Sequence, residues 1–264
     1  MKLYKITISG ADEHTDVKEL VAFIEQYYHY KGINIELGIQ VSPTKASFDS
    51  DRYRWLMKLH EQALGFCYVH LALHINPGWV EQVCAGSIPL ELIEFMNLFS
   101  HHYDGGVILE RIQLNFLIGR EEAPDMDRLH RVIEYYNNLR FIIPYNESNK
   151  QFINDFFLKY YGYERYNCFD LLYDESHGEG KSPQQWQPAV YPLIPQGYSG
   201  GLSPDNIGQA LDSIVANNKP DTKMWVDAEG KLKGDDGHLS LAKADSFIRK
   251  IQEWSQKNTQ SNQD

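Results

Sequence analysis

The chain has 264 residues, of which 42% are hydrophobic, and a formal net charge of −11 at pH 7. This length is enough to bury one sizeable core, and it also fits a single α/β barrel. The acidic charge argues against extended binding to nucleic acid or to an anionic membrane surface, although it is compatible with a local basic pocket. We therefore expect no nucleic acid and no membrane among the partners.

The three cysteines, Cys67, Cys84 and Cys168, are scattered along the chain. Their odd number and the lack of a C-x-x-C spacing indicate neither a disulfide framework nor a zinc site. The amino-terminal segment lacks the apolar stretch of a signal peptide, and no apolar run approaches membrane length. We expect a cytoplasmic protein with one domain over residues 1–255 and a polar, disordered tail over residues 256–264. The oligomeric state stays open.

Extended and helical patterns alternate along the chain. Each predicted unit is a strand followed by a helix. In chain order the first five are strand 3–9 and helix 16–30, strand 34–42 and helix 51–64, strand 66–75 and helix 78–99 (broken near 86–89), strand 107–116 and helix 125–136, and strand 140–145 and helix 148–160. The last three are strand 168–174 followed by a Gly-rich loop and a short helix around Gln184, a strand within 191–199 and helix 204–216, and strand 223–227 and helix 240–254. Eight such units in a chain of this length predict an α/β fold, a single (β/α)8 TIM barrel.

The predicted strands alternate polar and apolar side chains. In the first strand, Lys5, Thr7 and Ser9 share one face, and Tyr4 lies with the apolar residues on the other. A doubly wound sheet, the competing fold, has helices on both faces and favours strands that are apolar throughout. In a barrel the polar faces line the lumen, where buried charges need partners. The candidate lumen charges are the cations Lys5, Arg111 and Lys223 and the anions Glu36, Asp170 and Asp174. A half-exposed antiparallel sheet is the alternative, but the connections look helical rather than hairpin-like.

Barrel active sites lie at the carboxyl ends of the strands. The last lumen-facing residues are therefore the first candidates: Ser9, Gln40, His74, Asn115, Asp174 and Asp227. Asp174 leads because it ends an apolar strand, and a carboxyl group in a partly dry barrel mouth can keep a raised pKa and transfer a proton. The alternative is that Asp174 caps a loop or joins an ion pair. His70 and His74 lie about 13 Å apart along their strand, too far to share a metal ion, so we interpret them as hydrogen-bonded lumen histidines.

A glycine pair, Gly200 and Gly201, closes the seventh extended segment. Ser203 then suits the N-cap of the next helix, and Pro204 suits its first position. Such a turn exposes backbone N–H groups at a helix N-terminus, which is a place that binds phosphate. Many strand-to-helix turns contain Gly-Gly, so this turn indicates a phosphate site only together with the motifs around it.

Those motifs are Leu171-Leu172-Tyr173-Asp174 followed by Gly178-Glu179-Gly180-Lys181 and Trp186, the turn Ser199-Gly200-Gly201-Leu202-Ser203-Pro204-Asp205-Asn206, the strand end Val226-Asp227 with Gly230, and the pairs Gln113-Leu114 and Ser42-Pro43. Together they resemble the phosphoribosylanthranilate isomerase family, the barrel enzyme of tryptophan biosynthesis, and this chain resembles a divergent member. The resemblance spans most of the chain and is specific at the Gly-Gly-Leu turn.

The resemblance implies an aldose–ketose isomerase, an intramolecular oxidoreductase that converts an aminoaldose phosphate into an aminoketose phosphate through an enol. It implies Asp174 as the general acid and places Ser9 where the family has its general base, a Cys before Gly. It also implies a phosphorylated small-molecule substrate, and we expect no cofactor and no metal. From the resemblance or from their place at strand ends, the residues expected to bind substrate are Lys45, His74, Gln113, Asn115, Gly178, Gly180, Ser199, Gly200, Gly201, Asp227 and Gly230.

Several positions depart from the family pattern. The hydroxyl of Ser9 is no base near pH 7 without assistance, whereas a thiol with a pKa of about 8.5 can be tuned into range. Lys45 supplies a charge after Ser-Pro but lacks the bidentate fork of the family's Arg. Glu229 stands where the family has a small hydroxyl residue, and its charge repels a phosphate by roughly 1–4 kcal/mol at contact. Asn115-Phe116 replaces the family's His-Gly.

Three hypotheses follow from the sequence. The first is a working isomerase in which Asp174 is the acid and Glu175, His177 or His74 replaces the missing base. The second is a relative with altered chemistry that binds another small anion or a sugar. The third is a barrel that acts only as a binding or scaffold protein.

Overall fold

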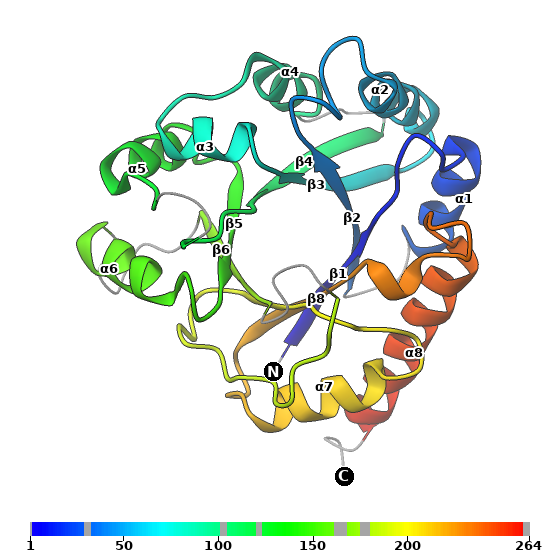
Figure 1. Ribbon diagram of the computed structural model, residues 1–264. Helices are drawn as coiled ribbons and strands as arrows, with labels where there is room; N and C mark the ends of the chain where they lie inside the picture. Colours follow the sequence, from blue (N-terminus) through cyan, green and yellow to red (C-terminus); the bar gives the residue numbers. More distant parts are fainter. Residues whose placement is uncertain are drawn as a thin grey trace.

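The structure, a computed structural model, is a ring of strands surrounded by helices (Figure 1). It describes residues 2–28, 33–100, 105–119, 123–160, 168–174 and 180–260. Within these residues, eight strands close into one barrel in the order β1 to β8, and every strand is parallel to both neighbours. The predicted α/β fold, a single (β/α)8 TIM barrel, is confirmed, and the doubly wound and antiparallel sheets are excluded.

The strands of the barrel are β1 (Lys2–Ser9), β2 (Asn34–Val41), β3 (Tyr68–Ile75), β4 (Gly106–Leu114), β5 (Arg140–Tyr145), β6 (Phe169–Tyr173), β7 (Gln196–Tyr198) and β8 (Lys223–Ala228). The helices are α1 (Val17–Tyr28), α2 (Asp51–Ala63), α3 (Trp79–Cys84), α4 (Leu90–Leu98), α5 (Met126–Tyr135), α6 (Lys150–Tyr160), α7 (Ile207–Ala216), the 3₁₀ helix η1 (Gly230–Leu232) and α8 (Leu241–Gln260). Each predicted strand overlaps an observed one, and the predicted break between α3 and α4 is present. None of the helices described is long and apolar enough to cross a membrane.

Side-chain caps define the starts of two helices. The carboxylate of Asp16 accepts hydrogen bonds from the backbone N–H groups of Lys18 and Glu19 at the start of α1. Ser50 caps α2 in the same way, because its hydroxyl accepts from the backbone N–H of Tyr53. Each bond satisfies a donor that the first turn of a helix leaves without a partner.

In the β6–α7 region one predicted helix is absent and another begins later than predicted. Residues 180–190 contain no helix around Gln184. The helix expected from Pro204 begins at Ile207 instead, and Ser203 is not its cap. The side chain of Asn206 explains the later start, because it accepts from the backbone N–H of Ser203 at 2.8 Å and donates to the carbonyl of Gly201 at 2.9 Å. These bonds hold residues 203–206 in a turn, and a turn closed by its own Asn competes with the helix.

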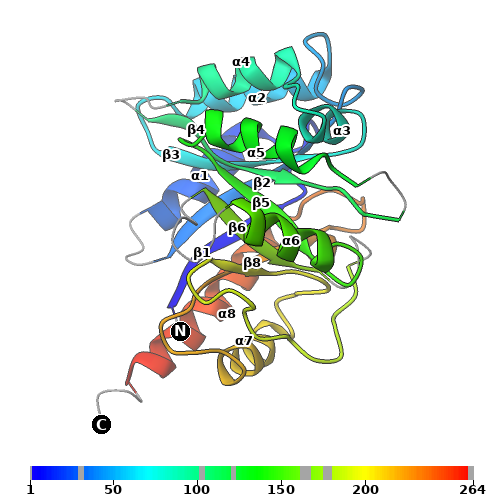
Figure 2. The same cartoon turned by 90° about the vertical axis from the view of Figure 1, so that its left-hand side faces the viewer.

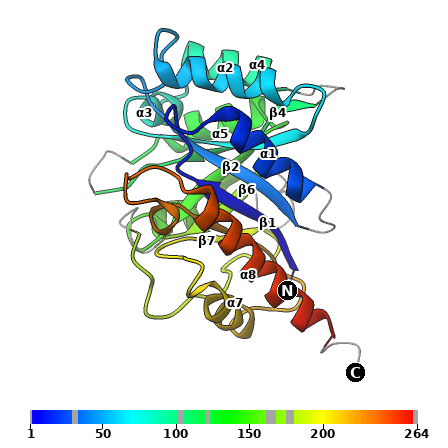
Figure 3. The same ribbon diagram turned by 90° about the vertical axis from the view of Figure 1, so that its right-hand side faces the viewer.

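The last helix runs further than expected. α8 continues to Gln260, so residues 256–260, which we assigned to a disordered tail, are helical, and residues 261–264 lie outside the described residues. The indole N–H of Trp254 donates to Asp212 of α7 at 2.7 Å, and Asn258 donates to the carbonyl of Trp254. These contacts anchor the final turns. The end of α8 and the start of β1 lie at the same end of the barrel (Figures 2 and 3), away from the carboxyl ends of the strands.

The alternation of the strands sorts side chains between the outer core and the lumen. The apolar faces pack beneath the helices, and Ile6 and Ile8 of β1 are fully buried there. Tyr4, predicted on that outer face, instead packs against a small lumen cluster of Ala72, Ile142, Leu172 and Trp225. The cause is a shift in the β1–β8 register between Leu3 and Lys5, which leaves Tyr4 as an extra residue whose side chain points inward.

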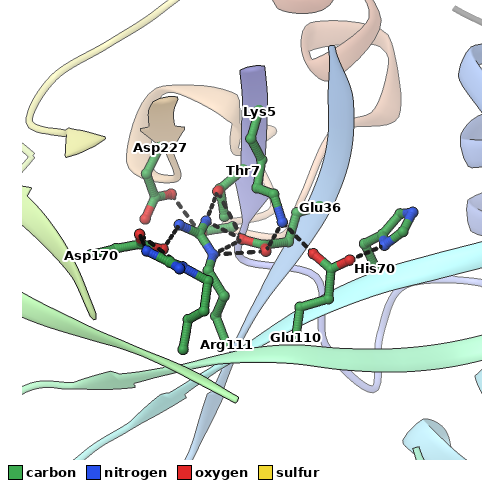
Figure 4. A network of polar contacts seen from close by, with 10 residues as sticks. Lys5, Thr7, Glu36, His70, Glu110, Arg111, Asp170 and Asp227 are labelled. Atoms are coloured by element: carbon green, nitrogen blue, oxygen red, sulfur yellow. Dashed lines mark hydrogen bonds and ion pairs between the residues drawn. The ribbon is translucent and has the colours of Figure 1, made fainter. Parts of the chain in front are cut away.

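The lumen below the mouth is filled by paired charges (Figure 4). The guanidinium of Arg111 donates to Glu36 at 2.9 Å and to Asp170 at 3.0 Å, and it lies 4.5 Å from the ring of Trp225. Lys5 donates to the same oxygen of Glu36, Oε2, at 2.8 Å. Burial raises the pKa of Glu36, but the charges of Arg111 and Lys5 outweigh this and hold the pKa well below its ordinary value. This network closes the lumen beneath the cavity described below.

The predicted charge balance of the lumen is right in part. Lys5 and Arg111 do pair with Glu36 and Asp170, but Lys223 is exposed at the start of β8. Two further members are Arg140, which pairs with Asp170, and Glu110, which contacts Lys5 and His70. Glu110 reaches the lumen beside Arg111 because the register of β3 and β4 shifts at this point. Period-two alternation alone does not reveal such a shift.

Candidate active site at the barrel mouth

A cavity of about 460 Å³ opens at the carboxyl ends of the strands. Its size is that of a site for a small organic ligand. It is lined by most of the residues that the sequence nominates: Gln40, His74, Gln113, Asn115, Asp174, Gly180, Ser199, Gly200, Gly201, Asp227 and Gly230. Ser9 reaches this lining through Asp227, and the exposed Lys45 through Gln40. Gly178, Glu175 and His177 lie outside the described residues.

A buried polar contact at the mouth joins the ends of β1 and β8. The hydroxyl of Ser9 donates to Oδ1 of Asp227 at 2.7 Å, and both side chains are buried. Burial raises the pKa of Asp227 to about 7, although the hydrogen bond from Ser9 lowers it. Asp227 therefore changes its protonation near neutral pH, which suits a group that gives and takes protons. We nominated Ser9 for the base position, but its hydroxyl donates a hydrogen bond to Asp227, the residue whose pKa suits proton transfer.

Gly38 of β2 makes room for this arrangement. It lies between Ser9 on β1, its register partner, and His74 on β3. A Cβ on Gly38 would overlap the hydroxyl oxygen of Ser9 and would lie 2.8 Å from Nε2 of His74. The two side chains therefore meet in the space that a side chain on Gly38 would fill. The sequence marks this glycine only as a member of a polar strand face.

His74 and Gln113 stand side by side on β3 and β4, where they are register partners. Their atoms His74 Nε2 and Gln113 Oε1 are buried, and no group in the described part of the chain hydrogen-bonds to either. Burial lowers the pKa of His74 to about 4, against the attraction of Glu229 and Glu36, so the imidazole is neutral at pH 7. We interpreted His74 as a hydrogen-bonded lumen histidine. Its Nε2 atom has no hydrogen-bond partner among the described residues, which differs from that interpretation.

Amide side chains fix the orientation of Gln113. Its Nε2 donates to Oδ1 of Asn115 at 2.7 Å, and Nδ2 of Asn115 donates to Oδ1 of Asn76 at 3.1 Å. This chain of amides leaves the buried carbonyl oxygen of Gln113, a hydrogen-bond acceptor, without a partner in a residue that lines the cavity.

Asp174 approaches the cavity from the other side, directly after β6. It is half-buried and lines the same cavity as Asp227. One of its carboxylate oxygens lies 3.6 Å from the point where a Cβ on Gly200 would be. The two carboxyl groups thus come from strands far apart in sequence and face one ligand-sized space.

Main chain packs closely on the glycine turn after β7. Gly200 and Gly201 both have positive φ, 105° and 62°. A Cβ on Gly201 would lie 2.5 Å from the backbone nitrogen of Ser182, and one on Gly200 would lie 2.7 Å from the carbonyl oxygen of Lys181. The backbone angles and this close approach explain both glycines without a ligand.

The charge of Glu229 is compensated within the mouth. Its carboxylate lies 3.0 Å from Nζ of Lys233 and accepts from the side-chain amide of Gln40 at 3.1 Å. The stem of Glu229 covers Gly10 at the end of β1, with Cγ 3.1 Å from the Cβ position. The repulsion that we expected between Glu229 and a phosphate is therefore weakened, because Lys233 and also Lys231 line the same cavity.

The chemistry available at the mouth comes from carboxyl, imidazole and amide groups. Among the described residues, no group of three or more His, Cys, Asp or Glu side chains is arranged to hold a metal ion. Cys67, Cys84 and Cys168 are buried and are not joined in disulfides. The arrangement is suited to proton transfer on a small polar ligand.

The barrel is similar to a solved structure of a known enzyme. No protein-family profile matches the sequence, and no curated protein sequence matches it either. A crystal structure of phosphoribosyl anthranilate isomerase from Thermus thermophilus is similar to this structure, with a TM-score of 0.50 and 15% sequence identity, over 94% of this chain and 98% of that chain. A likeness at this identity shows the barrel fold.

Proposed function

We propose that this barrel is an aldose–ketose isomerase that carries out an Amadori-type rearrangement of a small aminosugar phosphate. The observation that carries the proposal is the pair of carboxyl groups, Asp174 and Asp227, on one cavity of about 460 Å³. Such a rearrangement needs one group that donates a proton and one that accepts it. The sequence motifs and the fold likeness to phosphoribosyl anthranilate isomerase support the same chemistry.

In the proposed reaction, Asp174 gives a proton to the ring oxygen of the sugar as its bond to C1 breaks, and the amino nitrogen forms a C=N bond to C1. Asp227 then takes the proton from C2. The electrons of the C2–H bond form a C1=C2 bond, and those of the C=N bond return to nitrogen. The resulting enol becomes the ketose when its hydroxyl proton leaves and C1 gains a proton. No electrons are exchanged with another molecule.

Ser9 has a positioning role in this proposal. A hydroxyl is too weak a base to take the C2 proton near pH 7, but it holds Oδ1 of Asp227 at 2.7 Å. Asp227, with a pKa of about 7, would thus take over the base role that the family gives to a Cys at the position of Ser9. The barrel would keep the reaction with a different proton acceptor.

A second candidate is a relative that binds a sugar without phosphate. Two observations favour it: Glu229 stands at the end of β8, and residues 180–182 cover the Gly200–Gly201 turn. On the other hand, Lys231 and Lys233 line the cavity and favour an anionic group on the ligand. The two candidates differ in whether phosphate contributes to binding.

Complementation tests the proposed function. The chain is expressed in a tryptophan auxotroph that lacks phosphoribosylanthranilate isomerase, together with Asp174→Asn and Asp227→Asn. We expect growth with the unchanged chain and none with either variant. Asp221→Asn is the matched control, because Asp221 is exposed in the turn before β8, and it should support growth. Absence of growth with folded, expressed protein would favour the second candidate.

A further inference from the structure

We propose that His74 and Gln113 form a hydroxyl-binding subsite at the deep end of the mouth, which holds two adjacent hydroxyl groups of a sugar next to Asp227. The inference rests on the proposed function for the identity of this sugar as the substrate of the isomerase. The subsite itself rests on the two buried atoms that have no partner.

Both side chains are built into the barrel wall rather than placed on a loop. His74 is 4% exposed and Gln113 is 7% exposed, and each lines the cavity. Parallel strands that are hydrogen-bonded lie about 4.8 Å apart, so these register partners on β3 and β4 present their polar atoms side by side. That spacing suits groups on neighbouring carbon atoms of one ligand.

Both atoms lack a partner while the rest of the lumen is paired. Within the described residues, His74 Nε2 and Gln113 Oε1 are the buried side-chain atoms without a hydrogen bond. Buried polar atoms in folded proteins are nearly always hydrogen-bonded, and an exception calls for a specific explanation. A ligand that enters the cavity and bonds to both atoms provides one.

The hydrogen-bond roles select the chemistry of the ligand. The unpartnered atom of Gln113 is its carbonyl oxygen, which can only accept, because the NH₂ side of the amide is turned toward Asn115. A neutral imidazole nitrogen either donates or accepts, depending on its tautomer. A hydroxyl group matches both, because it donates to Gln113 and can do either at His74. A carboxylate and a doubly ionised phosphate monoester have no proton to donate to Gln113, so this end of the cavity disfavours these anions.

The position of the subsite says which part of the sugar it holds. Nε2 of His74 and the hydroxyl of Ser9 both border the space above Gly38, and Ser9 is bonded to Asp227. Hydroxyl groups bound at this subsite therefore lie next to Asp227, the group proposed to take the proton from C2. The lysines of the rim, Lys231 and Lys233, are left for the anionic end of the ligand.

Calorimetric titration of the purified chain with three probes tests the subsite. The probes are ribose 5-phosphate, 2-deoxyribose 5-phosphate and inorganic phosphate, none of which carries the amino group needed for the reaction. We expect ribose 5-phosphate to bind at least about tenfold more tightly than its deoxy analogue, because a site built for a hydroxyl rejects a ligand that lacks it. In Gln113→Leu and His74→Phe this preference should fall to within about twofold, with unchanged affinity for inorganic phosphate.

Gln196→Leu is the control. Gln196 is a buried glutamine of β7 whose amide already donates to the carbonyls of Leu171 and Gly197. This variant should lower the melting temperature more than Gln113→Leu but keep the preference for ribose 5-phosphate. Equal binding of both sugars by the unchanged chain, failure of ribose 5-phosphate to bind, or a preference that survives both subsite variants would overturn the inference. If complementation fails but the preference for ribose 5-phosphate is present and depends on His74 and Gln113, the isomerase proposal is refuted and the subsite proposal is supported.

Discussion

The lower lumen and the mouth of this barrel differ in whether their buried polar side chains have partners. Below, Arg111, Glu36 and Asp170 are buried and every charge has a partner. At the mouth, His74 and Gln113 each keep a buried atom without one. Burial alone therefore does not mark a functional group. Paired polar groups hold the barrel together, whereas unpaired ones at an open cavity are available to a ligand.

The largest effect should come from breaking the paired region. Arg111→Met leaves Glu36 and Asp170 buried without their shared cation, and we expect a loss of about 3–5 kcal/mol in the free energy of unfolding. Urea denaturation measures it. The control Arg128→Met removes an exposed cation paired with Asp125 and should change stability by less than about 1 kcal/mol. Similar losses for the two variants would mean that the lumen network does not act as a buried unit.

At the mouth, removal of a charge should stabilise the protein, in contrast to Arg111→Met. Because the pKa of Asp227 is raised to about 7, the folded state favours its protonated form. Its contribution to stability is thus complete below the ordinary pKa and is lost as the pH rises to about 7. Asp227→Asn should therefore leave stability nearly unchanged at pH 4 and raise it by up to about 4 kcal/mol at pH 8. Urea denaturation at both pH values would contradict this if the gain were larger at pH 4.

Gly38→Ala tests the space that joins Ser9 and His74. The added methyl group overlaps both side chains, so we expect a loss of about 1–3 kcal/mol in stability together with loss of ligand binding. Gly208→Ala in α7 is the matched control, since no atom lies within 4 Å of the position of its Cβ. It should stabilise the helix by about 0.5–1 kcal/mol. Unchanged ligand binding in Gly38→Ala would show that the site does not need the space at Gly38.

The smallest effect concerns the positioning of Asp227. Ser9→Ala removes the hydrogen bond that favours the charged carboxylate, so the pKa of Asp227 should rise by about one unit. The pH at which activity reaches half its maximum should shift upward by the same amount. Ser9→Thr, which keeps the hydroxyl, should retain the original profile. If Ser9 itself were the base, Ser9→Ala would abolish activity at every pH and Ser9→Cys would raise it.

The sequence predicts the strand ends of the site better than the contacts between them. His74, Asp174 and Asp227 were nominated from period-two alternation and the rule for barrel mouths, Gln113 was nominated from the family resemblance, and all four line the cavity. Their partners were not foreseeable, because the hydrogen bond between Ser9 and Asp227 spans 218 positions of the chain. Which polar groups meet depends on strand tilt and register, which no local pattern encodes.

By itself, the sequence determined the barrel and its inner and outer faces, because helix caps, strand alternation and the repeated strand–helix order are local properties of the chain. Only the tertiary structure decided where the alternation slips, as at Tyr4 and Glu110. It also decided which lumen groups are paired and which are left open. The physical reason is that desolvation and pairing depend on neighbours from other strands, and these determine whether a buried polar group stabilises the fold or is available to a ligand.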